Sequence, residues 1–392
     1  MDENGAERPS FWTGSNSFFI LRDLGRNTEI IFQSSAVSVT MAGQVVDDHV
    51  IIEDQSESSQ IYNRGWYGTP QSGGSLKLDL IEALYLLETE RLIVKTGDST
   101  LGFMDLMRLG NKIDKNFEIR YLVYRDLRSR GYIVKSDGGM ADFRVFPRGG
   151  SPSKTPSKWW VFALSERSLF DLDAILASLA SGKGLRKELL LAIVDEEGDV
   201  TYYEIRQASP AGKMRKAKAD QAAEGFFTGD RVIVSDPSAA KALHEGQFYG
   251  RLLGDKLQLS LIEASYLADS GHLVLRNART GRPMDAEQLK RHARKTQRDF
   301  DLRLKAYEDL RKRGLIVKTG FKYGSHFRAY EGDPNKMHAR FLIHAVPDGY
   351  IAFWPEISRA IRLAHGVRKE ILFCKVGDDD EVEYVKLMRC RP

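Results

Sequence analysis

The stretch GLRKELLLAIVDEEGDVTYYEI (184–205) recurs near the end of the chain as GVRKEILFCKVGDDDEVEYVKL (366–387). In each copy an apolar run leads into an acidic turn, and a second run rich in apolar residues follows, which is the pattern of two strands joined by a turn. Lys187 and Lys369 stand 182 residues apart, as do Pro210 and Pro392. Repetition at a constant interval indicates that a whole unit has been duplicated, so one fold should occur twice.

The similarity continues toward the N-terminus of each repeat. The matching pairs are DHVII (48–52) with DRVIV (230–234), WYG ending at Gly68 with FYG ending at Gly250, LKLDLIEALYLL (76–87) with LQLSLIEASYLA (257–268), YRDLRSRGYIVK (124–135) with YEDLRKRGLIVK (307–318), and DFRVF (142–146) with HFRAY (326–330). The interval changes by only a couple of residues along the way, reaching 184 between Phe146 and Tyr330. The loops of the two copies therefore have nearly equal lengths.

Each repeat is predicted to be α+β, with a small N-terminal α/β lobe and a C-terminal mixed-sheet lobe. In the first lobe we expect a short strand, a Gly turn, an amphipathic helix that includes Leu78 and Tyr85, and one more strand. In the second repeat we expect a single polar helix at about 285–313, three strands within 315–346, a helix near 355–365 and two final strands. The predicted boundaries are an N-terminal extension (1–45), a first repeat (46–210, with lobes 46–130 and 131–210), a linker (211–225) and a second repeat (226–392, with lobes 226–314 and 315–392). Two segments of the extension, 18–21 and 29–32, are compatible with a hairpin.

Composition excludes several classes of protein. The 392 residues suit two or three domains, and no apolar run reaches the roughly 20 residues of a membrane span. The first ten residues, MDENGAERPS, are polar and acidic, unlike a secretory signal, and Cys374 and Cys390 are too few for a disulfide framework or a cysteine zinc site. We therefore expect a cytoplasmic protein without a structural metal. The net charge of +4 combines 58 basic with 54 acidic residues and does not by itself indicate nucleic-acid binding.

The two repeats differ in their polar residues, and this difference points to function. The second repeat has Tyr330 where the first has Phe146, and it has His338 where the first has the histidine-free loop RGGSPSKTPSKWW (148–160). Lys369 is matched by Lys187, which we interpret as a remnant. On the C-terminal helix expected near 355–365, Arg359 and Arg362 align with Ala177 and Ala180. The first repeat is thus interpreted as a degenerate structural copy and the second as the catalytic copy.

Tyrosine, histidine and lysine together suit RNA cleavage in which the 2′-hydroxyl attacks the neighbouring phosphorus. That reaction needs a proton acceptor at the 2′-oxygen, a proton donor at the leaving 5′-oxygen and a cation for the charge that develops on the phosphate oxygens. Histidine suits the acid role because it titrates near neutrality, and lysine suits the electrostatic role. Tyrosine is the least apt member, since the ordinary phenol is a weak base near pH 7 unless cations surround it.

At these residues the chain resembles the archaeal and eukaryotic tRNA-splicing endonuclease family. The resemblance spans about 45–392 and is most specific in GFKYGSHFRAYEGDPNKMHARFLIHAV (320–346) and SRAIRLAHGVRKEILF (358–373). It implies a metal-independent triad with Tyr330 as general base, His338 as general acid and Lys369 as stabiliser of the transition state, and no cofactor. It also implies precursor tRNA with a bulge–helix–bulge as substrate, and products with a 2′,3′-cyclic phosphate and a 5′-hydroxyl.

The resemblance further implies assembly and RNA contacts. A chain with one structural and one catalytic repeat is expected to form a homodimer with two active sites. An acidic loop of the structural repeat, here Asp195, Glu196, Glu197 and Asp199, would then enter a basic pocket across the interface; without the resemblance an ordinary exposed turn would be favoured. Two arginines from different subunits would hold a flipped bulge base: Arg362 matches the first, while Arg389, with Arg391 as a fallback, is the candidate for the second.

One loop departs from simpler members of the family. The segment 149–158 of the first repeat has Lys154 and Lys158 among Gly, Ser and Pro residues. It is interpreted either as an arm that contacts RNA phosphate and broadens the choice of substrate, or as a loop that merely replaces a lost active site.

Two other classes remain as alternatives. A metal-dependent nuclease would use clustered carboxylates, although the acidic runs of this chain fall in turns. A non-catalytic RNA-binding or scaffold protein would be expected to lose its polar residues in both copies, whereas only one copy has lost them.

Overall fold

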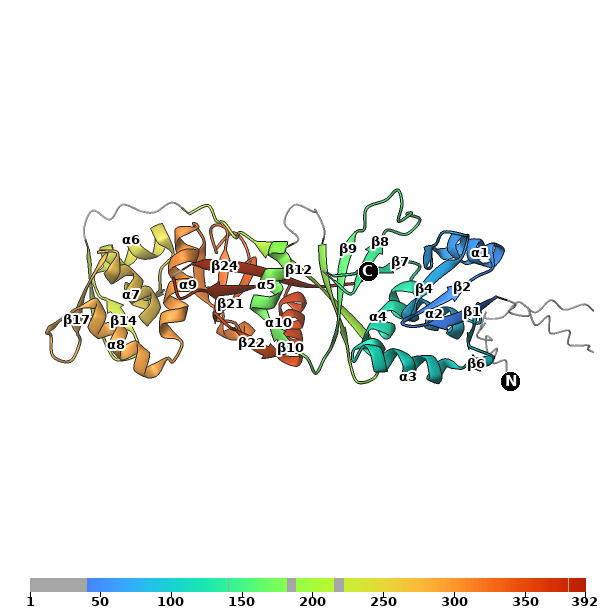
Figure 1. The fold of residues 1–392 in the computed structure, drawn as a ribbon. Coiled ribbons are helices and arrows are strands. Elements are labelled where there is room, and N and C mark those ends of the chain that lie inside the picture. Colours follow the sequence, from blue (N-terminus) through green and yellow to red (C-terminus); the bar gives the residue numbers. More distant parts are fainter. Residues whose placement is uncertain (1–40, 140, 182–187, 215–221, 380) are drawn as a thin grey trace, which may run out of the picture.

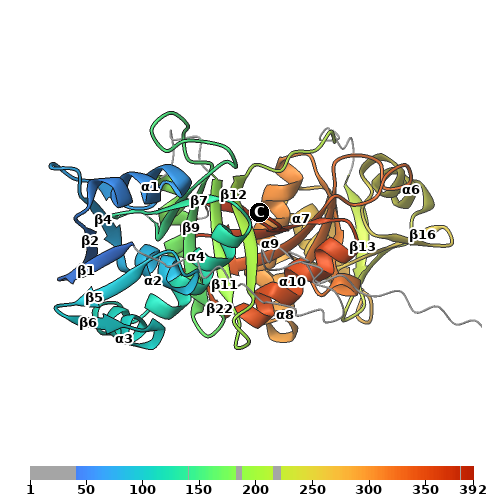
Figure 2. The ribbon, with the colours of Figure 1, turned by 90° about the vertical axis from the view of Figure 1, so that its right-hand side faces the viewer.

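The computed structural model describes residues 41–139, 141–181, 188–214, 222–379 and 381–392. Within them the predicted tandem α+β duplication is confirmed, since the same order of elements occurs twice. The N-terminal lobes of the two repeats lie at opposite ends of an elongated molecule, and the C-terminal lobes meet in the middle (Figures 1 and 2). The proposed hairpin within 1–45 and the remnant Lys187 lie outside the described residues.

Each N-terminal lobe is a six-stranded sheet covered by helices. In the first lobe the strand order is β3-β4-β2-β1-β5-β6, and in the second it is the equivalent β15-β16-β14-β13-β17-β18. The elements of the first lobe are β1 (Ala42–Val46), β2 (His49–Ile52), α1 (Gln55–Gly65), β3 (Thr69–Pro70), β4 (Leu76–Asp79), α2 (Leu80–Glu88), β5 (Ile93–Thr96), β6 (Ser99–Leu101) and α3 (Phe103–Ile113). Those of the second are β13 (Ala223–Phe227), β14 (Val232–Val234), α6 (Pro237–Gln247), β15 (Arg251–Leu253), β16 (Lys256–Leu259), α7 (Leu261–Asp269), β17 (Leu273–Asn277), β18 (Pro283–Met284) and α8 (Ala286–Thr296).

The same local signals start the central helix of both N-terminal lobes. Asp79 and Ser260 are the N-caps of α2 and α7, and each forms a capping box with the glutamate three residues later. Those glutamates, Glu82 and Glu263, also accept a hydrogen bond from the backbone N–H of the turn glycine, Gly68 or Gly250 respectively. The sequence motif that begins the helix therefore also fastens the preceding turn.

The two C-terminal lobes form one continuous ten-stranded sheet, in the order β19-β20-β21-β23-β24-β12-β11-β9-β8-β7. The first lobe contributes α4 (Phe117–Ser129), β7 (Ile133–Ser136), β8 (Phe143–Phe146), β9 (Trp159–Ser165), β10 (Leu169–Asp171), α5 (Leu172–Ser181), β11 (Glu188–Val194) and β12 (Val200–Ala208). The second contributes α9 (Phe300–Lys312), β19 (Ile316–Thr319), the 3-10 turn η1 (Phe321–Tyr323), β20 (Phe327–Tyr330), β21 (Phe341–Pro347), β22 (Ile351–Phe353), α10 (Trp354–Gly366), β23 (Glu370–Val376) and β24 (Val382–Cys390).

The seam between the repeats has two-fold pseudosymmetry. Strands β12 and β24 pair antiparallel with Ile205 opposite Leu387, the residue 182 positions later in the repeat. Beside this seam β10 pairs with β22, and a shared apolar core includes Phe170 and Trp354. A lysine of the second repeat, Lys375, reinforces the joint through ion pairs with Asp173 of the first repeat (2.6 Å) and Asp348 of the second (2.8 Å).

Equivalent, partly buried hydrogen bonds attach α4 and α9 to the sheet. The Tyr202 hydroxyl donates to Asp126 on α4, and the Tyr384 hydroxyl donates to Asp309 on α9, both at 2.6 Å. Each aspartate also pairs with the arginine four residues later, which is the C-cap of the helix. The duplicated interaction holds one helix against each half of the sheet.

The structure corrects three details of the sequence prediction. Two helices, α8 and α9, replace the single helix expected at 285–313, because Gln297 is extended (φ −133°, ψ 105°) and lets Phe300 turn into the core. Leu78 belongs to β4, since the cap at Asp79 starts the helix after it. The expected extension (1–45) and linker (211–225) are both too long at their C-terminal ends, because β1 begins at Ala42 and β13 at Ala223.

Candidate active site

Strand register brings Tyr330 and Lys369 to the same end of the sheet. Ala329 of β20 lies opposite Phe341 of β21, which in turn lies opposite Glu370 of β23. Neighbouring strands are separated by about 4.8 Å, so Ala329 and Glu370 are about 10 Å apart. Tyr330 follows the first of these residues and Lys369 precedes the second, and both side chains are long enough to span part of that distance.

The loop between β20 and β21 brings His338 to this end of the sheet. The backbone N–H of Arg340 donates to Ala329 O (3.1 Å), and the backbone N–H of Glu370 donates to Arg340 O (2.9 Å). The Arg340 guanidinium also pairs with Glu331 (2.7 Å) and Glu370 (3.0 Å). These contacts bind the loop to both strands, and they leave the His338 side chain exposed to solvent.

Tyr330 and Lys369 are held by their own surroundings. Tyr330 is 9% exposed and packs with Ile316 and Ala339, the residue after His338. Lys369 follows Arg368, whose left-handed backbone (φ 53°) ends the turn after α10, and its ammonium lies 5.6 Å from the centre of the Tyr323 ring. The Tyr330 side chain is therefore buried, whereas the side chains of Lys369 and His338 are more accessible to solvent.

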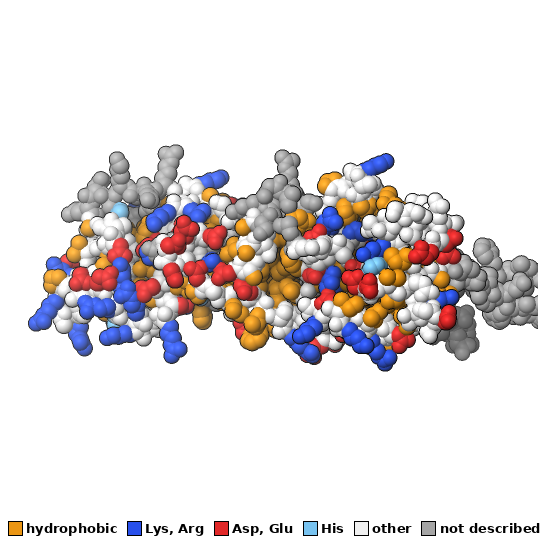
Figure 3. Space-filling model, in the orientation of Figure 1, with side chains coloured by type: hydrophobic (Ala, Val, Ile, Leu, Met, Phe, Trp, Pro, Cys, Tyr) orange, Lys and Arg blue, Asp and Glu red, His pale blue; other side chains and the backbone are white. Residues whose placement is uncertain are grey.

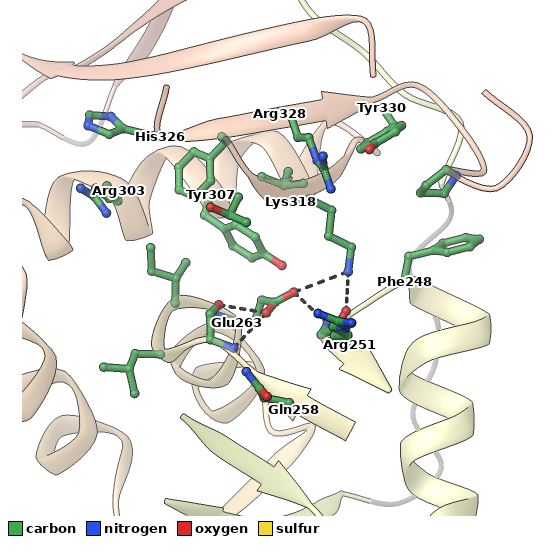
Figure 4. A pocket seen from close by; sticks show the side chains of 18 of the residues that line it. Phe248, Arg251, Gln258, Glu263, Arg303, Tyr307, Lys318, His326, Arg328 and Tyr330 are labelled. Carbon is green, nitrogen blue, oxygen red and sulfur yellow. Dashed lines mark hydrogen bonds and ion pairs between the residues drawn. The ribbon is translucent and has the colours of Figure 1, made fainter. Parts of the chain in front are cut away.

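A basic cleft of about 680 Å³ lies beside Tyr330, between the two lobes of the second repeat (Figure 4). The described residues that line it all fall between Arg231 and Asn335, so His338 and Lys369 are not part of its wall. Its charged lining residues are the basic Arg231, Arg251, Arg303, Lys318, Lys322 and Arg328 and the acidic Glu263. Such an excess of positive charge in a concave site favours an anionic ligand.

Glu263 organises the floor of this cleft. Its carboxylate accepts hydrogen bonds from the backbone of Gly250 (2.8 Å) and Ser260 (3.0 Å), and Lys318 Nζ lies 3.9 Å away (Figure 4). Lys318 Nζ also donates to Gly250 O (2.8 Å). Burial lowers the pKa of Lys318, although the Glu263 carboxylate acts in the opposite direction. The glutamate thus has much of its hydrogen-bonding capacity used by the backbone.

Two partly buried histidines, His326 and His344, lie on neighbouring strands, and His326 lines the cleft. The backbone N–H of Ala345 donates to His326 Nδ1 (3.0 Å), which leaves the ring proton on Nε2. In the first repeat Asp142 takes this position and accepts the equivalent bond from Ala163 (2.8 Å). The His344 ring stacks on Phe373, and its pKa is lowered to about 4, mainly by burial and to a smaller extent by the His326 ring.

The arginines proposed for RNA contact lie on exposed surfaces. Arg359 and Arg362 are exposed on α10, and within the described part of the chain neither has an ion pair. Arg389 is exposed on β24, where it lies opposite Tyr203 of β12. On the other side of β24, the register with β23 places Arg389 next to the position of Lys369. Arg391 follows the end of β24. Arg389 therefore lies at the same end of the sheet as Lys369.

The lysines of the loop 149–158 lie in the first repeat, away from the cleft lining. Lys154 is exposed, and the Lys158 ammonium sits over the Trp159 ring at 3.9 Å. Stacking on the indole gives Lys158 a contact within its own repeat. A role for either lysine in RNA binding stays a prediction.

The acidic loop forms a tight turn between β11 and β12. The Asp195 carboxylate accepts hydrogen bonds from the backbone N–H groups of Glu197 (3.1 Å) and Asp199 (2.9 Å), and Glu196 pairs with Arg167 (2.8 Å). Glu196, Glu197 and Asp199 are exposed. The charges of Glu197 and Asp199 thus face solvent, while that of Glu196 is paired with Arg167.

Sequence reasoning missed Lys318 and Arg328, which line the cleft. Both belong to motifs that occur in the two copies, LIVK and FRAY in the second repeat, and shared residues were attributed to the fold. Their ion-pair partners differ between the repeats, and only the structure shows that difference.

In the described residues, no group of three or more His, Cys, Asp or Glu side chains could hold a metal ion, and no helix among them has the length and apolar character of a membrane span.

Comparison with known proteins matches both halves of each repeat. The sequence model of the tRNA intron endonuclease N-terminal domain matches residues 41–107 and 223–290, and that of the tRNA intron endonuclease catalytic C-terminal domain matches 117–202 and 300–384. The latter matches include α4 and α9, which the sequence prediction assigned to the N-terminal lobes.

The chain is also similar over most of its length to several archaeal proteins. The chain is 40% identical to a tRNA-splicing endonuclease of Methanococcoides burtonii over 90% of its own length and 100% of the relative's. It is 38% identical to one of Methanosarcina mazei (87% and 96% of the two chains) and 33% identical to one of Halobacterium salinarum (83% and 93%).

Proposed function

The chain belongs to the tRNA intron endonuclease family, and from this premise we propose that it excises introns from precursor tRNA at bulge–helix–bulge motifs without a metal ion. Membership supports an endonuclease that acts in tRNA splicing. The motif, the metal independence and the product ends are our proposal. The observation that carries it is the difference between the repeats: Tyr330 and His338, at the same end of the sheet as Lys369, have no counterparts in the first repeat.

The proposed reaction is an internal transesterification. Tyr330 accepts the proton of the 2′-hydroxyl, and the 2′-oxygen bonds to the adjacent phosphorus. The bond from phosphorus to the 5′-oxygen breaks, and His338 gives that oxygen its proton. Lys369 stabilises the charge on the non-bridging oxygens. The products are a 2′,3′-cyclic phosphate and a 5′-hydroxyl.

Incubation of the protein with bulge–helix–bulge RNA in excess EDTA tests this proposal. We expect cleavage and a cyclic phosphate end. Cleavage that is restored only by Mg²⁺ would favour a metal-dependent nuclease, and no cleavage with retained binding would favour an RNA-binding scaffold.

Substitution of Tyr330 provides a sharper test because the first repeat shows that the fold accepts phenylalanine at this position. We predict that Tyr330→Phe cleaves about 100-fold or more slowly, as expected for the loss of a general base, and binds RNA normally. Lys369→Ala should also be slow, whereas its counterpart Lys187→Ala serves as the matched control and should cleave at the wild-type rate. Equal rates for the two lysine variants would contradict the assignment of the catalytic copy.

We also propose that two chains form a homodimer. The exposed acidic loop around Glu196 and Glu197 supports this, as do apolar side chains of the β10–β22 ribbon, where Leu169, Ile351 and Phe353 are each more than half exposed. Figure 3 shows hydrophobic side chains gathered in the middle of the molecule, over α5 and α10. Light scattering measures the mass; we expect twice 44.3 kDa, and a lower mass for the double variant Glu196→Lys and Glu197→Lys.

A further inference from the structure

Both repeats place a lysine directly opposite an arginine on adjacent strands. Lys135 faces Arg144 in the β7–β8 pair, and Lys318 faces Arg328 in the β19–β20 pair. Residues directly opposite each other project from the same face of a sheet, and like charges in this position are destabilising. Each pair therefore needs anionic partners.

The first repeat supplies these partners from within the chain. Lys135 Nζ lies 2.9 Å from the Glu82 carboxylate, and the Arg144 guanidinium lies 2.9 Å from Asp137. Two carboxylates thus neutralise two cations, and the pair is satisfied without a ligand.

The second repeat lacks one of the two carboxylates. Gly320 occupies the position that corresponds to Asp137. A side chain there would meet the Ser325 hydroxyl at 2.3 Å, so the backbone has closed over the place of the missing carboxylate. The remaining one, Glu263, lies 3.9 Å from Lys318. Arg328 has no ion pair among the described residues, and its buried Nε has no hydrogen-bond partner among them.

The unpaired guanidinium of Arg328 lies in the basic cleft beside Tyr330, the proposed general base. Arg328 and Tyr330 are two residues apart on β20, so they project from the same face, and the guanidinium carbon is 5.9 Å from the centre of the phenol ring (Figure 4). Arg303, another cation of the cleft, is already paired with Asp299 at 2.7 Å. Arg328 thus lies in the cleft without an ion pair among the described residues, and Lys318 beside it has a carboxylate only at 3.9 Å.

We propose that Arg328 and Lys318 form an anion subsite that binds a backbone phosphate of the RNA next to the one that is cleaved. This inference rests on the proposed function, since it names the contact that holds RNA in the same site. The planar guanidinium suits two oxygens of one phosphate, and the lysine adds a second charge. The first repeat has the same two residues, but there Asp137 pairs with the arginine, which leaves no uncompensated guanidinium for a phosphate.

Salt-dependent binding tests the subsite separately from chemistry. The ligand is a bulge–helix–bulge RNA with a 2′-deoxy nucleotide at the cleavage position, which cannot be cut. Its affinity is measured from low to high KCl for the wild type, Arg328→Gln and the matched first-repeat variant Arg144→Gln. We expect Arg328→Gln to bind about 10-fold or more weakly, and the slope of log affinity against log salt to become shallower by about 0.7–0.9. Arg144→Gln should keep the wild-type slope and affinity.

Melting temperatures separate a binding role from a folding role. Arg328→Gln removes an uncompensated charge and should not lower the melting temperature, whereas Arg144→Gln breaks an ion pair and should lower it slightly. Arg328→Lys keeps the charge and should restore the slope. If Arg328→Gln bound RNA with the wild-type slope, the subsite would be refuted. If the wild type failed to cleave ordinary precursor RNA, the proposed function would fail instead, so the two failures are distinguishable.

Discussion

Replacing His344 by phenylalanine should make the protein more resistant to acid. The substitution copies the first repeat, which has Phe162 at the equivalent position, so the packing is compatible with the fold. In the native chain the His344 ring stacks on Phe373 with centroids 5.7 Å apart, and burial lowers its pKa from 6.5 to about 4. The unfolded chain therefore binds a proton at a pH where the folded chain does not.

The direction and size of the effect follow from this difference. Because the folded pKa is the lower one, the stability contribution is complete above pH 6.5 and is lost as the pH falls toward 4. A difference of about 2.5 units corresponds to about 3 kcal/mol in all, and about 2 kcal/mol of this is lost by pH 5. His344→Phe has no such proton to bind, so its free energy of unfolding should fall less between pH 7.5 and pH 5, by about 2 kcal/mol.

Urea unfolding at the two pH values measures this difference. Other titrating groups are common to both proteins and cancel in the comparison. His365, whose side chain is exposed on α10, provides the control, and His365→Gln should follow the wild-type pH profile. If His344→Phe lost as much stability at pH 5 as the wild type, the reasoning from burial would be refuted.

Two further predictions concern the contacts that join the repeats and their helices. Tyr202→Phe and Tyr384→Phe should each lower the free energy of unfolding by about 1.5 kcal/mol, because each leaves an aspartate with only its arginine partner, and the double variant should show the sum in urea unfolding; a double variant no less stable than either single one would contradict this. Lys375→Met removes the ion pairs to Asp173 and Asp348, whose side chains are 39% and 41% exposed, so the free energy of unfolding should fall in low salt and by less in 1 M NaCl. An equal loss at both salt concentrations would exclude an electrostatic origin.

Much of the fold could be predicted because the information was local and appeared twice. The capping motifs at Asp79 and Ser260 need only four neighbouring residues, and the apolar periodicity of the strands is visible in the chain itself. The break between α8 and α9 was missed because both helices are strongly polar and no Pro or Gly separates them. There the burial of Phe300, which is a tertiary contact, overrides the helical propensity of the flanking residues.

The sequence alone determined that a unit is duplicated and that Tyr330 and His338 occur in one copy only, since both statements depend on the order of residues. The tertiary structure decided where such residues lie relative to one another. Pairing of strands that are distant in the chain joins the two C-terminal lobes at β12 and β24 and brings Tyr330 and Lys369 to one end of a single sheet. It also decided that Arg144 is neutralised while Arg328 is not. Ion pairing depends on distances of a few ångströms between residues far apart in sequence, and only the folded chain sets those distances.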